Sequence, residues 1–251
     1  MKLHLDSSSY IETNEPIDIS ISLVEGEQNL RAWYVNPPEM KPVMENGFVG
    51  SVALGGSVNF RSIFFNPHGH GTHTECLGHI TPEIYSVNQS LKTYFFKAQL
   101  VTVTPIETEL NGELDSIIHR QLLREGDWDI AIEALVIRTL PNSLTKTHSD
   151  YSATNPPYLS LDCIALLNER GVKHLLIDLP SVDRENDGGA LAFHHQFWGV
   201  PDQLNFERTI TELIYVPDSV EDGAYLLELQ TAPFENDASP SRPILYQIKK
   251  G

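Results

Sequence analysis

Stretches rich in β-branched and aromatic residues recur along this chain, separated by polar segments that contain glycine and proline. Such stretches are typical of β-strands, because branched and aromatic side chains fit a pleated, half-buried surface. The predicted strands cover residues 17–24, 50–60, 99–103, 130–139, 172–178, 212–216, 225–230 and 244–248. Strands therefore dominate the predicted architecture.

One segment has clear helical spacing. Apolar residues recur every three to four positions over residues 160–170, where Ser160 can cap the first turn and Gly171 can end the last. The predicted strand 172–178 follows at once and would deliver Asp178, Ser181 and Asp183 to a surface crevice. We therefore expect an α/β fold, a mixed sheet with flanking helices, and we expect the polar segment 234–243 to be a mobile loop.

Length and composition limit the classes of protein to which the chain can belong. With 251 residues and 41% hydrophobic content, it can form one large domain, and we expect a single domain over residues 1–251. The net charge of −17 argues against nucleic acid or an anionic membrane as a partner. No segment resembles a signal peptide or a spanning helix, which predicts a cytoplasmic protein. The two cysteines, Cys76 and Cys163, are too few and too far apart for a disulfide framework.

Four histidines and a glutamate are concentrated within residues 68–79: His68, His70, His73, Glu75 and His79. Neutral imidazoles together with a carboxylate favour a divalent transition metal. The intervening glycines allow tight turns, and an extended backbone at residues 72–76 would place His73 and Glu75 on the same face. The sequence thus predicts half of a metal site, and the alternative is a loop with one or two buried, hydrogen-bonded histidines.

A second polar cluster can supply the other half of this site. His194 and His195 lie among apolar residues, and Glu207 precedes a strand-like segment. Burying a histidine or a glutamate without a partner costs several kcal/mol, so these side chains need partners. A shared metal pocket is one explanation, and a buried histidine–glutamate pair is the other.

Several motifs together resemble the metal-dependent cyclase family, which includes kynurenine formamidase and isatin hydrolase. Residues 71–79, Gly-Thr-His-Thr-Glu-Cys-Leu-Gly-His, are similar to the family's GTH-x-D-x-x-x-H core. Residues 177–183, Ile-Asp-Leu-Pro-Ser-Val-Asp, resemble its D-x-P-S-x-D segment. The resemblance implies a swivelling β/β/α fold, a homodimer or homotetramer, and hydrolysis of a small amide or lactam at one or two divalent ions, zinc or manganese.

Two positions depart from the family pattern. Glu75 stands where the family has aspartate, and its longer side chain can still coordinate. Gly69 stands where the family has its first histidine ligand, four residues before His73. His68 and His70 flank that place, and we slightly favour His68 as the replacement.

The resemblance also implies roles for the remaining candidates. His195 and Glu207, at the family's spacing, would hold a second ion that Glu75 bridges, with His194 as an alternative to His195. His79 matches the family's general base and acid, although it can also be a fourth ligand or brace the loop. A bound divalent ion would make hydroxide available near pH 7 to attack a carbonyl. The predicted activity is therefore arylformamidase-like, and the alternative is a noncatalytic metal or small-ligand binding protein that retains the fold.

Overall fold

The computed structural model describes residues 1–110, 112–124, 128 and 131–251. A mixed nine-stranded sheet organises the body, with neighbouring strands in the order β17-β8-β15-β14-β12-β9-β16-β18-β3. Its central strands β9, β12, β14 and β15 are parallel, and the strands at both ends are antiparallel. The strand bounds are β3 Ile17–Asp18, β8 His73–Glu75, β9 Phe95–Val103, β12 Ala134–Thr139, β14 His174–Ile177, β15 Thr209–Glu212, β16 Gly223–Glu228, β17 Ala238–Pro240 and β18 Ile244–Gln247.

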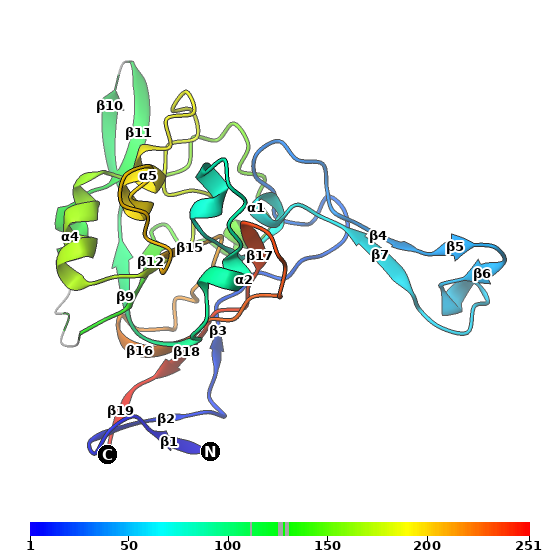
Figure 1. The fold of residues 1–251 in the computed structure, drawn as a ribbon, viewed down its shortest axis with the longest axis horizontal. Coiled ribbons are helices and arrows are strands. Elements are labelled where there is room, and N and C mark those ends of the chain that lie inside the picture. Colours follow the sequence, from blue (N-terminus) through cyan, green and yellow to red (C-terminus); the bar gives the residue numbers. More distant parts are fainter. Residues whose placement is uncertain (111, 125–127, 129–130) are drawn as a thin grey trace.

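Helical segments within the described residues are short. The α-helices are α1 Pro67–His70, α2 Val87–Ser90, α3 Arg120–Arg124, α4 Asp162–Arg170 and α5 Ala192–Trp198, and the 3₁₀ helices are η1 Val52–Leu54, η2 Leu77–Ile80 and η3 Leu144–Thr147. In Figure 1, α4 and α5 lie beside the sheet at the opposite side of the body from β4 and β7.

Four small sheets accompany the main one in the described part of the chain. β1 and β19 flank β2 near the two termini, β11 lies between β10 and β13, and two hairpins, β4–β7 and β5–β6, follow one another along an arm that projects from the body (Figure 1). The bounds are β1 Lys2–His4, β2 Ser9–Glu12, β4 Glu39–Pro42, β5 Met44–Glu45, β6 Phe48–Val49, β7 Arg61–Phe64, β10 Ile106–Leu110, β11 Glu113–Ile118, β13 Tyr158–Leu159 and β19 Lys249–Lys250.

The core lies on both faces of the main sheet. Along β12 the side chains alternate, so that Leu135 and Ile137 join the cluster beside α4 and α5 while Ala134 and Val136 join the cluster on the opposite face. All six residues of β12 are buried, as expected for a central parallel strand that is covered on both sides. The predicted mixed α/β architecture is therefore confirmed.

Several predicted elements need correction. Residues 17–24 are strand only at Ile17–Asp18, and residues 50–60 form turns and η1 rather than a strand. The strand placed at 212–216 ends at Glu212 instead, and residue 130, the first of the predicted strand 130–139, lies outside the described residues. Segment 234–243 is more than a loop, because β17 pairs with β8.

The predicted helix is present, with a different first turn. It begins at Asp162, and Leu161 rather than Ser160 occupies the N-cap position without a side-chain hydrogen bond. Its end is as expected, since Gly171 adopts φ 72°, a left-handed conformation that glycine tolerates without steric cost. Within the described part of the chain, no helix is long and apolar enough to cross a membrane.

Candidate metal centre

Two paired strands place three of the site residues on one face. β8 and β15 are antiparallel, and His73 lies directly opposite Glu212 in their register. On the other face Thr74 and Thr211 form a hydrogen bond of 2.7 Å between their hydroxyl groups. Because strand residues alternate between faces, Glu75 shares the face of His73 and Glu212, and His73 Nε2 lies 3.5 Å from Glu212 Oε2.

Helix α1 brings His68 to the same carboxylate. Asn66 caps this short helix by accepting a hydrogen bond from the backbone N–H of Gly69, and His68 Nδ1 lies 3.0 Å from Glu75 Oε2. A Cβ atom at Gly69 would lie only 2.8 Å from a Val35 methyl carbon and 3.0 Å from the Ala32 carbonyl oxygen. The position where the family resemblance predicts a histidine is therefore crowded, so that a side chain there would require its neighbours to shift, and His68 approaches Glu75 from the preceding position.

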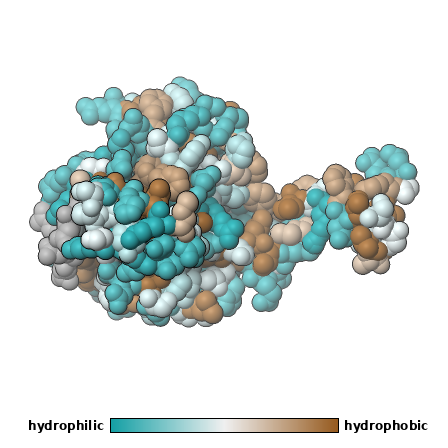
Figure 2. Space-filling view, turned by 90° about the horizontal axis from the view of Figure 1, so that it is seen from below, coloured by the Kyte–Doolittle hydropathy of each residue, from teal (hydrophilic) through white to brown (hydrophobic). Residues whose placement is uncertain are grey.

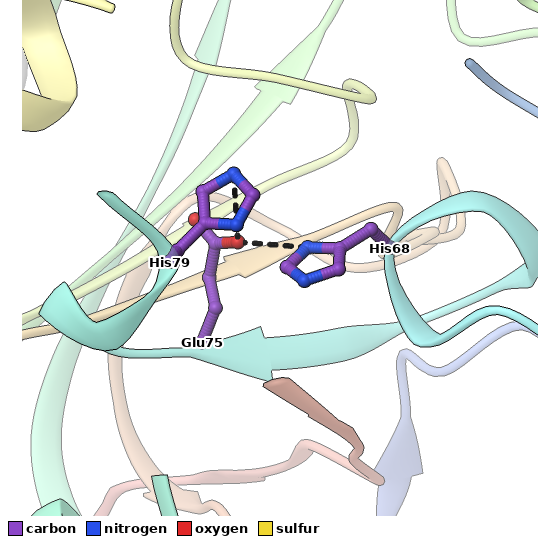
Figure 3. Close-up of side chains that lie close together, drawn as sticks. All are labelled: His68, Glu75 and His79. Carbon is purple, nitrogen blue, oxygen red and sulfur yellow. Dashed lines mark ion pairs between the residues drawn. The ribbon is translucent and has the colours of Figure 1, made fainter. Parts of the chain in front are cut away.

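His79 approaches from the other side of Glu75. It lies in η2, and its Nε2 is 4.0 Å from Glu75 Oε2. Figure 3 shows the two imidazoles converging on the Glu75 carboxylate, His68 from α1 and His79 from η2. The Asp237 carboxylate connects them through the same oxygen, Oδ2, which is 2.9 Å from His68 Nε2 and 3.3 Å from His79 Nδ1.

Helix α5 supplies a fourth imidazole. Asp183 accepts hydrogen bonds from the backbone N–H groups of Phe193 and His194, so it caps the first turn of this helix. The same carboxylate lies 2.6 Å from His194 Nδ1, and His194 Nε2 then lies 3.1 Å from Glu75 Oε1. Asp183 thus fixes both the start of the helix and the direction of the ring.

All four histidines follow one hydrogen-bonding pattern. One ring nitrogen faces an oxygen acceptor outside the cluster, which is Asp237 for His68 and His79, Asp183 for His194, and the Gly71 carbonyl for His73. An acceptor at that nitrogen requires a proton there. In the neutral ring the other nitrogen therefore has the lone pair that a metal needs, and in the protonated ring it can donate to Glu75 or Glu212. Metal-binding histidines show this arrangement, in which an outer acceptor orients the ring.

Buried atoms without hydrogen bonds also fit a cation. Among the described residues, His73 Nε2 and Glu212 Oε1 are buried and have no hydrogen-bond partner, and Glu75 Oε2 is buried with ion-pair contacts to His68 at 3.0 Å and His79 at 4.0 Å. The ligand atoms of His68, Glu75 and His79 lie within 4.8 Å of one another, as do those of His73, Glu75 and Glu212. A divalent cation in each group would satisfy these atoms, and Glu75 belongs to both groups.

Burial and neighbouring charges raise the pKa values of three groups in the cluster. Burial opposes the charged forms of His68 and His194, but hydrogen bonds to Asp237, Asp183 and Glu75 raise the pKa of each imidazole to about 10. Burial and the nearby Glu75 carboxylate raise the pKa of Glu212. Without a cation, two buried carboxylates this close require positive charge from the surrounding imidazoles.

Some of the predicted site residues lie in the cluster and others do not. His68, His73, Glu75 and His79 are in the cluster. His70 is turned away: its Nδ1 accepts from the backbone N–H of Asn66 and its Nε2 donates to the Asn36 carbonyl, both at 2.8 Å. Of the two candidates for the missing ligand, His68 is therefore the one near Glu75.

The predicted pair His195 and Glu207 is not brought to the cluster. His195 Nδ1 lies 3.4 Å from the Val200 carbonyl, because adjacent residues on a helix point about 100° apart and His194 faces the site. Glu207 is exposed and forms a surface ion pair of 2.6 Å with Lys173. His194 and Glu212 take the places that the spacing assigned to His195 and Glu207.

Two site residues carried little sequence signal. The only signal for Glu212 was an acidic residue in a segment rich in β-branched residues. Its position opposite His73 depends on the register of β15 with β8. Asp237 lies in a polar segment whose contact with α1 and η2 depends on the pairing of β17 with β8. Predicting Asp237 as a site residue would have required knowing that residues 238–240 pair with β8.

A cavity of about 260 Å³ opens beside the cluster. Trp33 lines it, and Trp33 and the next residue, Tyr34, both have φ near +60°, a conformation that costs non-glycine residues about 1–2 kcal/mol each. Glu185 holds this segment by accepting hydrogen bonds from the Tyr34 hydroxyl group and from the backbone N–H groups of Ala153 and Asn155. The cavity is lined by Trp33, Asn66, His68, His79, Ser181, Arg184, Glu185, Asp187, Leu191, His194 and Glu212.

The fold agrees with comparisons to known proteins. The Cyclase family, described as "Putative cyclase", matches residues 17–184, and the chain belongs to this family. It is 28% identical to a kynurenine formamidase of Bacillus cereus over 241 residues, 95% of this chain and 100% of the relative. The crystal structure of a novel cyclase is similar, with a TM-score of 0.66, 14% identity and coverage of 94% and 90% of the two chains. An isatin hydrolase bound to the product analogue thioisatinate has a TM-score of 0.62, 14% identity and coverage of 94% and 93%.

Proposed function

We propose that this protein is a metal-dependent hydrolase of a small amide or lactam, with an arylformamidase-like activity. The observation that carries this proposal is the position of Glu75, a fully buried carboxylate shared by two groups of potential ligands beside an open cavity. The relationship to a kynurenine formamidase over nearly the whole chain supports the same reaction class.

The candidate ligands fall into two groups, with zinc or manganese as the expected ions. His73, Glu75 and Glu212 would hold one ion, while His68 and His194 approach the two oxygens of Glu75 from the cavity side. When bound, the metal supplies Lewis acidity, which lowers the pKa of water and polarises a carbonyl group. Asp183 and Asp237 keep the imidazoles of His194 and His68 in the tautomers that such binding requires.

His79 is the residue that we assign to proton transfer. Its Nδ1 faces Asp237, which places the ring proton on that atom and leaves Nε2 as the basic nitrogen. With 29% of its side chain exposed, His79 reaches the cavity, whereas His73 and Glu75 are fully buried. Nε2 can therefore take a proton from an attacking water and return it to the leaving nitrogen.

The cavity supports a small substrate with an aromatic group. A volume of about 260 Å³ holds a molecule of one or two rings rather than a polymer, and the Trp33 indole at the rim offers an apolar face. Two other aromatic residues near this region do not line the cavity, because Phe64 is exposed on the arm and Trp198 is buried against His194.

Metal analysis and kinetics on matched variants test this proposal. We expect wild-type protein to contain one or two equivalents of zinc or manganese by elemental mass spectrometry and to hydrolyse an N-formyl arylamine. His73→Ala should lose the metal, while His79→Ala should keep at least part of it and lose hydrolysis by about 100-fold or more. A wild type that takes up neither metal would refute the proposal, and a metal-loaded wild type without activity on formyl-amides and lactams would indicate a noncatalytic binding protein.

A further inference from the structure

Trp33, which lines the cavity, follows a segment that is fastened to the body. The backbone N–H of Arg31 donates to the Ser149 carbonyl at 2.9 Å, and that of Ala32 donates to the Gly69 carbonyl at 3.0 Å. Ala32 is 1% exposed. The chain is therefore fixed up to the residue before Trp33, and the position of the indole depends on the contacts that follow.

Several residues around the cavity have positive φ although none of them is glycine. Trp33 and Tyr34 have φ of 61° and 58°, Ala153 and Asn155 have 61° and 47°, and Leu191 has 42°. Residues in such sparsely populated conformations persist only where surrounding contacts hold them, and they are concentrated at binding sites. Neighbouring side chains must therefore hold this part of the chain in place.

The Glu185 carboxylate makes the contacts that hold these segments. Its Oε1 accepts from the Tyr34 hydroxyl group at 3.1 Å and from the backbone N–H of Ala153 at 2.6 Å, and its Oε2 accepts from the backbone N–H of Asn155 at 2.9 Å. All three donors belong to residues with positive φ. The Ser152 hydroxyl group adds a bond of 2.9 Å from the backbone N–H of Tyr34. One carboxylate thus ties residues 33–34 to residues 153–155.

Glu185 also belongs to the loop that orients the metal centre. Two residues earlier, Asp183 bonds to His194 Nδ1. Two residues later, Asp187 fixes the loop by accepting hydrogen bonds from the backbone N–H groups of Gly189, Ala190 and Leu191. Asp183 therefore serves a candidate metal ligand, and Glu185, on the same ordered loop, serves the aromatic wall of the cavity.

We propose that Glu185 is a positioning residue for substrate binding, which holds the Trp33 indole at the cavity through the Tyr34 hydroxyl group. This inference rests on the proposed hydrolase function, because it assigns Trp33 to the aromatic part of the substrate. When the binding-competent conformation is only partly populated, the apparent affinity falls by that fraction. Loss of the Glu185 contact should therefore weaken substrate binding and leave the chemical step, at the metal centre and His79, unchanged.

The first test is the kinetics of Tyr34→Phe, which removes one hydroxyl group from a side chain that is 67% exposed and so leaves the fold intact. For an N-formyl arylamine we expect KM to rise about three- to tenfold and kcat to change by less than about twofold. An N-formyl alkylamine, which has no ring for the indole to contact, should show a smaller change in KM.

Tyr246→Phe is the matched control for this substitution. The Tyr246 hydroxyl group donates to Glu228 at 3.0 Å, a similar bond between β18 and β16 in the main sheet. The control should keep the KM of wild type. A KM that is unchanged in Tyr34→Phe, or a fall in kcat without a rise in KM, would overturn the proposal.

Tryptophan fluorescence tests the positioning of Trp33 without metal or substrate. The other two tryptophans, Trp128 and Trp198, are 8% and 0% exposed, and subtracting the signal of Trp33→Phe isolates the contribution of Trp33. Tyr34→Phe and Glu185→Ala should raise its quenching by acrylamide at least about twofold, because the released indole spends more time in solvent. Glu185→Gln keeps an acceptor oxygen and should raise it less.

The two measurements separate this inference from the proposed function. A wild type that hydrolyses no amide, but whose variants show these changes in quenching, would refute the proposed function and support the positioning of Trp33 by Glu185. Unchanged quenching in both Tyr34→Phe and Glu185→Ala would overturn the inference, whether or not the protein is active.

Discussion

The metal centre and the arm reverse the usual distribution of side chains in opposite ways. The first buries charged residues, with His73 and Glu75 fully inaccessible, and the second exposes apolar residues over its whole length. Both arrangements are costly for a chain alone in water, because buried charges lose solvation and exposed apolar surface orders water. The comparison teaches that each region leaves groups without partners, buried ligand atoms in the metal centre and exposed apolar side chains on the arm (Figure 2).

Removing a carboxylate from the cluster should have the largest effect. Glu212→Gln keeps the shape of the side chain and removes its charge, so we expect metal affinity and hydrolysis to fall by more than about 100-fold. Glu207→Gln is the matched control, because Glu207 is exposed and pairs only with Lys173 among the contacts described. Equal effects of the two substitutions on metal content would contradict the placement of Glu212 in the site.

Substituting one glycine in each region measures how much that region contributes to the free energy of unfolding. A Cβ atom at Gly78, next to His79, would lie 2.1 Å from the Tyr85 carbonyl oxygen, so Gly78→Ala should lower the free energy of unfolding by about 3 kcal/mol. Gly56→Ala in the arm meets an equally close backbone atom, but the arm is not packed into the core. The free energy of unfolding of this variant in urea should therefore change by less than about 0.5 kcal/mol.

If Gly56→Ala lowered the stability of the body as much as Gly78→Ala, the arm would be part of the same cooperative unit. The contrast between the two regions would then fail.

Removing the carboxylate that orients two of the imidazoles should have an intermediate effect on metal affinity. Asp237→Asn removes the charged acceptor that holds His68 Nε2 and His79 Nδ1, and we expect metal affinity to fall about 10–100-fold. Glu235→Gln is the control, since Glu235 is nearby in sequence and bonds to Asn88 and Gln89 outside the cluster. Competition with a chromophoric chelator measures both, and an unchanged affinity in Asp237→Asn would exclude a positioning role.

A histidine outside the cluster, His174, should make the stability of the protein depend on pH. His174 is buried against Phe96 and bonds to Thr209, and burial, with a smaller contribution from Lys173, lowers its pKa to about 4, while Glu207 opposes the shift. The folded state therefore favours the neutral ring. The contribution of His174 to the free energy of unfolding is fully present above the unfolded pKa of about 6.5 and is lost as the pH falls towards 4. Between pH 7 and pH 5 this loss amounts to about 2 kcal/mol.

Urea unfolding of wild type and His174→Gln at pH 7 and pH 5 measures this contribution. The wild type should lose more stability than the variant on acidification. Parallel losses would show that His174 titrates normally. The contrast with His68 and His194, whose pKa values are raised by carboxylates, shows that neighbours rather than residue type set the direction.

The sequence by itself determined the mixed α/β class, the helix that ends at Gly171, and four of the cluster residues. These features depend on local patterns, namely helical spacing, glycine after a helix, and alternation along an extended segment. His73 and Glu75 could be placed on one face because their separation of two residues decides it in any strand.

Tertiary structure decided the rest. Helix phase selected His194 over His195, strand register selected Glu212 over Glu207, and the pairing of β17 with β8 brought in Asp237. The crowding around Gly69 selected His68 for the cluster, while His70 was held by backbone groups. Apolar residues 50–60 satisfied a strand pattern, but their glycines and their position on the arm gave turns. Each outcome depends on which segments meet in space, and this is set by long-range packing that spacing along the chain does not encode.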